Sequence, residues 1–427
     1  MATTEPANGR DATVWTSFGP GLVWAAAAIG VSHLVQSTRA GATTGFALAI
    51  VILLALVLKY PFFEFGARYA AATRTSLVEG YARIGTWALW LFLAITLITA
   101  TVSQAAVVLF TAYLIQFIFG LDWALPVTAS LLMAACATLL WVGRYRALDF
   151  TVKAILVILG LSTLGAAFVT LPHADLSTLT LWPAGVVGTV VPFAFLLALV
   201  GWMPSPVDTS VWSSLWTLAK DESTGVRTPV RHARLDLLGG YIGTGVLAFA
   251  FVTLGAGVMF GSGVAFSPQG TVFSTQLIDL YGQTLGAWAR PIVMVAVLTT
   301  MFSTALTVID GFPRAIERTI ANLQSGASDE TPSNTTGRFY WMSIAGLAAF
   351  TLMVLALFIG NLTTMVDFAT IVSFLTAPVL GYLNLRAVTS PQMPAEHRPG
   401  RGMVTYAWIG LILLGGTGLV YLVSLLV

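Results

Sequence analysis

A series of apolar runs, each about as long as a lipid bilayer is thick, most constrains how this chain can fold. A helix needs about 20 mostly apolar residues to cross the hydrocarbon core. Only 9% of the residues are charged and 57% are hydrophobic, so polar side chains are too few to cover a surface that faces water. The sequence therefore predicts an all-α integral membrane protein with eleven transmembrane helices. We place them at approximately 18–38, 44–70, 87–119, 123–142, 150–171, 186–217, 236–261, 286–312, 339–360, 365–386 and 404–426.

The lysines and arginines predict the orientation, because the cytoplasmic segments of membrane proteins are rich in these residues. With a cytoplasmic N-terminus, all but three of the 20 lysines and arginines fall in inner segments. The exceptions are Arg39 and Arg290 on the outer side, and Lys59 within the second span. We therefore predict a multi-pass protein of the cell (inner or plasma) membrane with its N-terminus in the cytoplasm and its C-terminus outside.

Two of the apolar runs are interrupted by groups that do not suit a helix facing lipid. In the first run, Gly30-Val31-Ser32-His33 places a hydroxyl and an imidazole at the depth of the bilayer. In the sixth run, residues 200–208 contain two prolines and a carboxylate. Interrupted helices at matching places in two halves indicate the binding site of a transporter. The alternative is that both are glycine or proline kinks that only shape packing.

The two interruptions suggest an inverted repeat of five plus five helices with one extra helix, because the first span starts inside and the sixth starts outside. This division places the binding site where the two halves meet. We expect a cytoplasmic tail over 1–14, a first five-helix repeat over 15–171, broken helix 6 and the following inner loop over 172–234, the rest of the second repeat over 235–386, and an inner loop with helix 11 over 387–427.

The interruptions supply the candidate binding groups, because a broken helix frees backbone carbonyls for cations and amides for anions. His33 and Asp208 each have a structural alternative, as a satisfied buried histidine and as a carboxylate paired within the fold. The candidate substrate-binding residues are Gly30, Ser32, His33, Val200, Met203, Ser205 and Asp208. The candidate metal ligands among them are His33, Met203 and Asp208.

Two further pairs of charged residues have the i, i+4 spacing that joins side chains on one helix face. They are Glu64 with Arg68 and Asp310 with Arg314, and we interpret them as structural or inner-gate ion pairs. Enzyme signatures are absent from the sequence, and the single Cys136 permits no intramolecular disulfide. We expect a monomer without cofactor, enzymatic activity or nucleic-acid partner, which acts on a small ion or solute in the bilayer.

Five groups of short motifs lie in a fixed order along the chain. They are Gly19-Pro20-Gly21, Gln36 with Ala40-Gly41-Ala42 and Gly45, Ala67-Arg68 with Ser76-Leu77 and Glu79, Met203-Pro204, and Ser303-Thr304 with Asp310-Gly311-Phe312. In order and spacing they resemble the NRAMP (SLC11) family of divalent-metal transporters over most of residues 15–390. The resemblance implies a LeuT-like fold with broken helices 1 and 6.

The sequence departs from the family at the metal site itself. The family's Asp-Pro-Gly-Asn signature aligns with residues 30–33, so that Gly30 replaces the acidic ligand and His33 replaces the asparagine. The resemblance assigns the methionine ligand to Met203 and the carbonyl donor to Val200. The acids that the family uses for proton transfer on helix 3 have no counterpart, so we expect weak or no proton coupling.

The sequence leaves three functions open. The first is an NRAMP-like secondary transporter of a small ion, nominally a divalent metal cation, that works by alternating access. The second is a carrier of a small organic cation, an amino acid or an inorganic anion on the same fold, which Gly30 favours because a divalent ion at mid-membrane needs a carboxylate. The third is a membrane sensor that does not transport.

Overall fold

The computed structural model describes residues 19–142, 145–325, 337–358 and 360–426. Within these ranges the chain is helical and forms no β-strand beyond one isolated bridge between Val187 and Val191. The all-α fold predicted from the sequence is therefore confirmed. The expected tail over 1–14 lies outside the described residues.

Eight of the described helices are long and apolar enough to cross a membrane. Three more expected spans correspond to α8 (Tyr145–Thr170) and to the two broken helices described below. The chain is thus a multi-pass membrane bundle, and the count of eleven spans stays a prediction. The eight long helices are α4 (Ala49–Thr73), α6 (Thr86–Phe119), α7 (Leu125–Val142), α11 (Val230–Val258), α13 (Ala289–Ser325), α14 (Arg338–Phe358), α15 (Leu362–Val388) and α16 (Arg401–Ser424).

The first and sixth spans are both interrupted, as their sequences indicate. Each apolar run stops, the chain bends at glycine or proline, and a second helix continues beyond the bend. The pieces of the first span are α2 (Pro20–Ala28), the π-helix η1 (Ser32–Ser37) and α3 (Thr38–Thr44), and those of the sixth are α9 (Phe193–Gly201) and α10 (Thr209–Thr224).

Two short helices were not expected from hydropathy, α5 (Leu77–Ile84) and α12 (Gly270–Leu285). Helix α5 begins with a capping box, in which the Ser76 side chain caps the helix and Glu79 bonds back to the Ser76 backbone. This pattern is visible in the sequence, but the segment is too short to register as a span. The remaining connections contain the short 3₁₀ turns η2 (Leu171–His173), η3 (Leu176–Thr178), η4 (Pro183–Gly185) and η5 (Ala395–His397).

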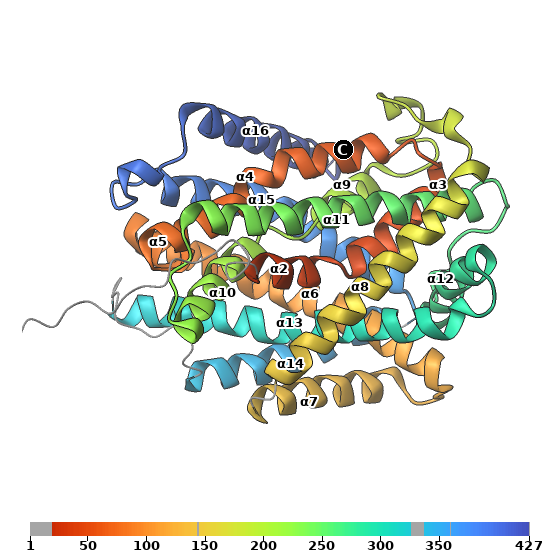
Figure 1. Cartoon of the computed structure of the whole chain (residues 1–427), viewed down its shortest axis with the longest axis horizontal. Coiled ribbons are helices and arrows are strands. Elements are labelled where there is room, and N and C mark those ends of the chain that lie inside the picture. The colour runs from red at the N-terminus through yellow and green to blue at the C-terminus, as the bar shows by residue number, and fades with distance from the viewer. Residues whose placement is uncertain (1–18, 143–144, 326–336, 359, 427) are drawn as a thin grey trace, which may run out of the picture.

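Burial separates the central helices from the peripheral ones. The most apolar window of α4, α6, α11 and α13 is 67% buried, whereas that of α14 is only 22% buried and that of α16 is 28% buried. Figure 1 shows α16 along one side of the bundle and α7 with α14 along the opposite side, with α2, α6 and α11 between them. The broken helices therefore lie in the protein interior, where freed backbone groups are tolerated.

Small residues allow the interior helices to approach closely. A Cβ on Gly66 of α4 would lie 2.2 Å from the Ser210 carbonyl oxygen of α10, so any side chain there would push the two helices apart. The Asp236 carboxylate of α11 accepts hydrogen bonds from the backbone amides of Gly19 at 3.2 Å and Gly21 at 2.6 Å. This carboxylate satisfies free amides at the start of α2.

Candidate functional site

The break in the first span lies between Ala28 and Ser32. The Ser32 hydroxyl donates to the Ala28 carbonyl at 3.0 Å, which satisfies an acceptor at the end of α2. A Cβ on Gly30 would lie 3.1 Å from both Oγ1 and Cγ2 of Thr304 on α13. Gly30 therefore allows the broken helix to contact α13 at this level.

The break in the sixth span runs from Gly201 to Thr209 and contains the cis peptide bond between Met203 and Pro204. The side chain of Lys59, on α4, reaches into this break. Its ammonium donates hydrogen bonds to the carbonyl oxygens of Val200 at 3.1 Å, Gly201 at 2.9 Å and Ser205 at 2.8 Å. Lys59 is 1% exposed, so these carbonyls replace its hydration shell.

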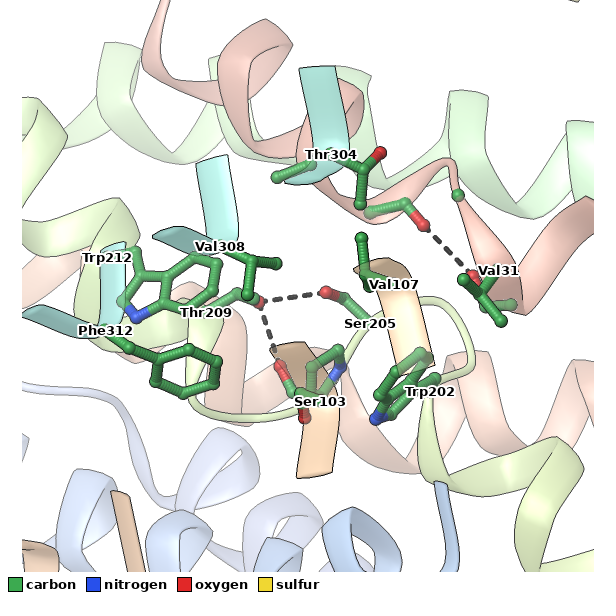
Figure 2. A pocket seen from close by; sticks show the side chains of 15 residues that line it. Val31, Ser103, Val107, Trp202, Ser205, Thr209, Trp212, Thr304, Val308 and Phe312 are labelled. Atoms are coloured by element: carbon green, nitrogen blue, oxygen red, sulfur yellow. Dashed lines mark hydrogen bonds between the residues drawn. The ribbon is translucent and has the colours of Figure 1, made fainter. Parts of the chain in front are cut away.

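A small cavity of about 30 Å³ lies between the two breaks, α6 and α13 (Figure 2). Trp212 and Phe312 lie at one end of it and Val31 and Trp202 lie toward the other. The two interruptions therefore meet at one place, as the paired pattern in the sequence suggests. The cavity is lined by Ala27, Ala28, Gly30, Val31, Ser32, Ser103, Val107, Trp202, Ser205, Pro206, Thr209, Trp212, Thr304, Val308 and Phe312.

The chemistry of the lining is aromatic and hydroxylic. No Asp, Glu, Lys, Arg or His side chain belongs to the described lining set. The Thr209 hydroxyl donates to the Pro206 carbonyl oxygen at 2.9 Å and accepts from the Ser205 hydroxyl, whose Oγ lies at 3.2 Å. Ser103 is 2% exposed, and no described residue lies within hydrogen-bonding distance of its hydroxyl. A buried hydroxyl without a partner at a cavity is available to bind a solute.

Three of the candidate residues lie at this cavity: Gly30, Ser32 and Ser205. The other four lie outside the lining set. Among them, the Val200 carbonyl is bound by Lys59, and the Met203 side chain is completely buried.

His33 is directed away from the break, toward α11. Its Nδ1 pairs with the Ser32 hydroxyl at 2.8 Å, and its Nε2 pairs with the Thr244 carbonyl oxygen at 3.0 Å. The ring also packs edge-on against Phe251 of α11 at 6.3 Å between centroids. Both ring nitrogens are engaged, so the imidazole holds helix 1 against α11, which is the structural alternative stated for it above.

Asp208 precedes α10 and is 2% exposed. One carboxylate oxygen accepts a hydrogen bond from the Thr99 hydroxyl of α6 at 2.8 Å, and the other has no hydrogen-bond partner among the described residues. A coulombic interaction connects this carboxylate with Lys59. Asp208 thus interacts with the lysine electrostatically, without a direct salt bridge between the two side chains.

The three candidate metal ligands do not present a joint donor set in this structure. His33 bonds to α11, Asp208 bonds to α6, and neither they nor Met203 line the cavity. Within the described residues, no group of three or more His, Cys, Asp or Glu side chains is arranged to hold a metal ion.

The two charged pairs named from their spacing form ion pairs. Arg68 contacts Glu64 at 2.7 Å and Arg314 contacts Asp310 at 2.8 Å. Arg234 of α11 also contacts Glu64, so this pair joins α4 to a second helix. Whether either pair gates the transport path stays a prediction.

A further ion pair joins α3, at the end of the broken first span, to α15. Arg39 binds Asp367 of α15 through two hydrogen bonds, at 2.7 Å and 3.1 Å. Its guanidinium also lies 4.9 Å from the ring centroid of Phe195 on α9. Sequence reasoning placed Arg39 on the outer side but assigned it no partner, because its two contacts lie far along the chain.

Sequence reasoning also missed Lys59 as part of the break. A charged residue inside a span is costly and marks a functional or structural site, so its position at mid-span was a usable signal. Its partners could not be read from the sequence, because they are backbone oxygens of residues more than a hundred positions away.

Comparisons with known proteins agree on one family and one fold. The family model described as natural resistance-associated macrophage protein-like (Nramp) matches residues 21–424. An uncharacterized protein of Pasteurella multocida is 33% identical over 418 residues, which cover 96% of this chain and 90% of that protein.

Two solved structures are similar in fold to this chain. A mutant of the Eremococcus coleocola manganese transporter matches with a TM-score of 0.73 at 14% identity, over 99% of this chain and 90% of that chain. MhsT in complex with L-phenylalanine matches with a TM-score of 0.61 at 14% identity, over 95% of this chain and 98% of that chain. At these identities the likeness shows the fold alone, and it confirms the LeuT-like architecture.

Proposed function

Because this chain belongs to the Nramp family, we propose that it is a secondary transporter that moves a small solute across the membrane by alternating access around its two broken helices. The fold is that of metal-ion transporters. One observation carries the proposal: the two breaks meet at a single cavity, and its lining contains a hydroxyl from each break, Ser32 and Ser205. We expect no catalytic activity and only weak or no proton coupling.

The lining of the cavity favours a solute without net charge over the divalent metal cation that the family resemblance makes the nominal cargo. A bare divalent ion needs several oxygen ligands and compensating charge, and the lining set contains no carboxylate. A small polar solute needs hydrogen-bonding partners and an apolar wall, which Ser103, Thr304 and Trp202 provide. A zwitterionic amino acid is such a solute, and MhsT binds L-phenylalanine on the same architecture.

We expect small zwitterions to raise the melting temperature of the purified protein, and Mn²⁺ to leave it unchanged. The panel contains alanine, leucine, phenylalanine, methylammonium, sulfate and Mn²⁺, and the responding solutes are then tested for uptake into proteoliposomes. Ser103→Ala should weaken binding by about tenfold, because one hydrogen bond contributes about 1 kcal/mol or slightly more.

The matched control for the cavity is Ser262→Ala, in the turn after α11, where the hydroxyl donates to the Met259 carbonyl away from the lining set. This variant should bind solutes as the wild type does. Stabilisation and uptake of Mn²⁺ together with no response to any zwitterion would contradict the solute proposal and restore the divalent cation as cargo.

Alternating access predicts that the Arg39–Asp367 pair closes one side of the cavity. The accessibility of the cavity is measured by labelling a Val107→Cys reporter with a membrane-impermeant thiol reagent. Asp367→Ala should raise this labelling by about fivefold, because losing an ion pair that contributes about 1 kcal/mol shifts the equilibrium between the closed and open states by that factor. The background is Cys136→Ala, which removes the buried native thiol. Labelling should rise only on the face of the membrane where Arg39 lies.

Asp279→Ala is the control for the gate. Asp279 pairs with Arg290 at 2.8 Å, half-exposed, outside the broken helices. Its removal should not change labelling of the reporter. Equal labelling in both variants would show that the Arg39–Asp367 pair is not a gate.

A further inference from the structure

The side chain of Lys59 is the feature that the proposed function leaves unexplained. A lysine in the middle of a membrane span is costly and needs a compensating environment. Here the ammonium lies at the end of α9, whose C-terminal carbonyls carry partial negative charge. It also lies 5.9 Å from the ring centroid of Phe63.

The hydrogen bonds of this ammonium are complete. An ammonium has three donors, and each reaches a different carbonyl oxygen of the break, at 2.8 to 3.1 Å. On the acceptor side, the Val200 carbonyl has lost its helical donor, because the residue four positions later is Pro204, which has no N–H. The Val200 oxygen keeps one backbone donor, the Met203 amide at 3.1 Å, and Lys59 supplies a second donor.

The same carbonyls are the groups that a broken helix offers to a transported cation. Val200 is the carbonyl donor that the family resemblance assigns to the metal, and its oxygen accepts both Lys59 Nζ and the Met203 amide at 3.1 Å. A carbonyl oxygen has two lone pairs, so this acceptor is fully used. A second cation at the cage would also face the ammonium at close range.

A carboxylate, that of Asp208, also interacts with the Lys59 ammonium. This interaction is electrostatic, and Thr99 of α6 holds one of the carboxylate oxygens. The cation and its counter-ion are thus both supplied by the protein, on α4 and at the start of α10.

We propose that Lys59 is a tethered cation, which occupies the carbonyl cage of the α9–α10 break (the oxygens of Val200, Gly201 and Ser205) and excludes metal ions from it. The inference depends on the proposed function only in taking this break as part of the solute site. It assigns to a covalently attached ammonium the place that a mobile cation would otherwise take.

The test removes the Lys59 ammonium by substitution and then adds a small alkylammonium ion to the solution. Lys59→Ala leaves space for a small alkylammonium, whereas Lys59→Met keeps the bulk of the stem and removes the charge. Both variants should melt about 5–10 °C below the wild type. Propylammonium chloride should restore at least half of that loss in Lys59→Ala, with saturation, and should not stabilise Lys59→Met. Sodium chloride at equal ionic strength is the salt control.

A second lysine provides the matched control. Lys220 lies on α10 outside the break, with its side chain near Gly19. Lys220→Ala should show no response to propylammonium. A merely structural role for Lys59 predicts lower stability in both Lys59 variants but no selective rescue of Lys59→Ala by an amine, and that result would overturn the proposal.

A second experiment measures metal binding to the wild-type protein, so it does not depend on a variant that folds. Calorimetric titration with Mn²⁺ should give no saturable heat, whereas Lys59→Ala, if it is recovered folded, should gain affinity for Mn²⁺ or Na⁺ at least tenfold above the wild type. Saturable Mn²⁺ binding to the wild type that Asp208→Asn abolishes would show that the cage accepts a metal beside Lys59, and would overturn the proposal. Because these readouts are binding and stability, a failure of solute uptake would contradict the proposed function and leave this inference standing.

Discussion

Gly201→Ala should abolish the recovery of folded protein, although it adds a single methyl group. A Cβ at this position would lie 1.9 Å from the carbonyl oxygen of Thr370 on α15 and 2.7 Å from its carbonyl carbon. Both atoms are backbone and belong to a regular helix, so neither can rotate away. Overpacking a well-packed core typically costs about 1–3 kcal/mol and occasionally more, and a clash with backbone belongs to the upper end of that range.

The position of Gly201 makes the effect larger still. The residue ends α9, and its carbonyl is one of the three that bind Lys59. Moving α9 away from α15 would therefore also pull this oxygen away from the buried ammonium. We expect the variant to elute as aggregate in size-exclusion chromatography, or to melt at least 10 °C below the wild type.

Gly243→Ala is the matched control for this prediction. Gly243 lies within α11, where no atom lies within 4 Å of an added Cβ. Because alanine favours helix over glycine by about 1 kcal/mol, this variant should be as stable as the wild type or slightly more stable. A Gly201→Ala protein that is monodisperse and melts within 2 °C of the wild type would show that α9 and α15 do not approach as closely as the structure has them.

Glu79→Ala should strongly destabilise the protein. Glu79 is completely buried at the start of α5. One carboxylate oxygen accepts from the Ser76 amide at 2.7 Å and the Ser76 hydroxyl at 2.6 Å. The other accepts from Arg318 at 2.5 Å and Asn322 at 2.8 Å, both on α13.

Removing this carboxylate takes away one acceptor of the buried Arg318 guanidinium, together with the Asn322 contact and part of the helix cap. Breaking a buried ion pair by deleting one partner costs about 3–5 kcal/mol. We expect a fall of at least 10 °C in the melting temperature measured by intrinsic fluorescence. Glu79→Gln should recover part of the loss, because an amide oxygen can still accept from Ser76.

The control for this prediction is Glu396→Gln. The Glu396 side chain is 80% exposed and lies 3.7 Å from His397, and an exposed pair contributes about 0–1 kcal/mol. Its melting temperature should stay within 2 °C of the wild type. If Glu79→Ala behaves like Glu396→Gln, the contact between α5 and α13 does not depend on this carboxylate.

The large features of the fold were predictable because they follow from local composition. Apolar runs of bilayer length identify spans without knowledge of their partners, as α6 and α15 show. Glycine and proline interrupt helices through their own backbone properties, so the breaks at Gly30 and Pro204 could be located. Short elements were harder, since α5 and α12 fall below the length of a span and carry no strong hydropathy signal.

The candidate site was predictable in position and only partly in membership. Gly30, Ser32 and Ser205 lie at the cavity because they belong to the breaks themselves. His33 lies within the same break, but its ring is directed toward α11 and bonds to Thr244. The direction of a side chain depends on which helix packs beside it, and no local pattern states that.

The sequence by itself determined a polytopic helical membrane protein with two interrupted spans, because chain length, hydropathy and helix-breaking residues act within a few turns. Only the tertiary structure decided what fills the site. The ammonium of Lys59 and the carbonyls of residues 200, 201 and 205 meet because α4 packs against the sixth helix. Such a contact depends on atoms that packing brings together. Because every residue has a backbone carbonyl, the residue types do not indicate which carbonyls the lysine binds.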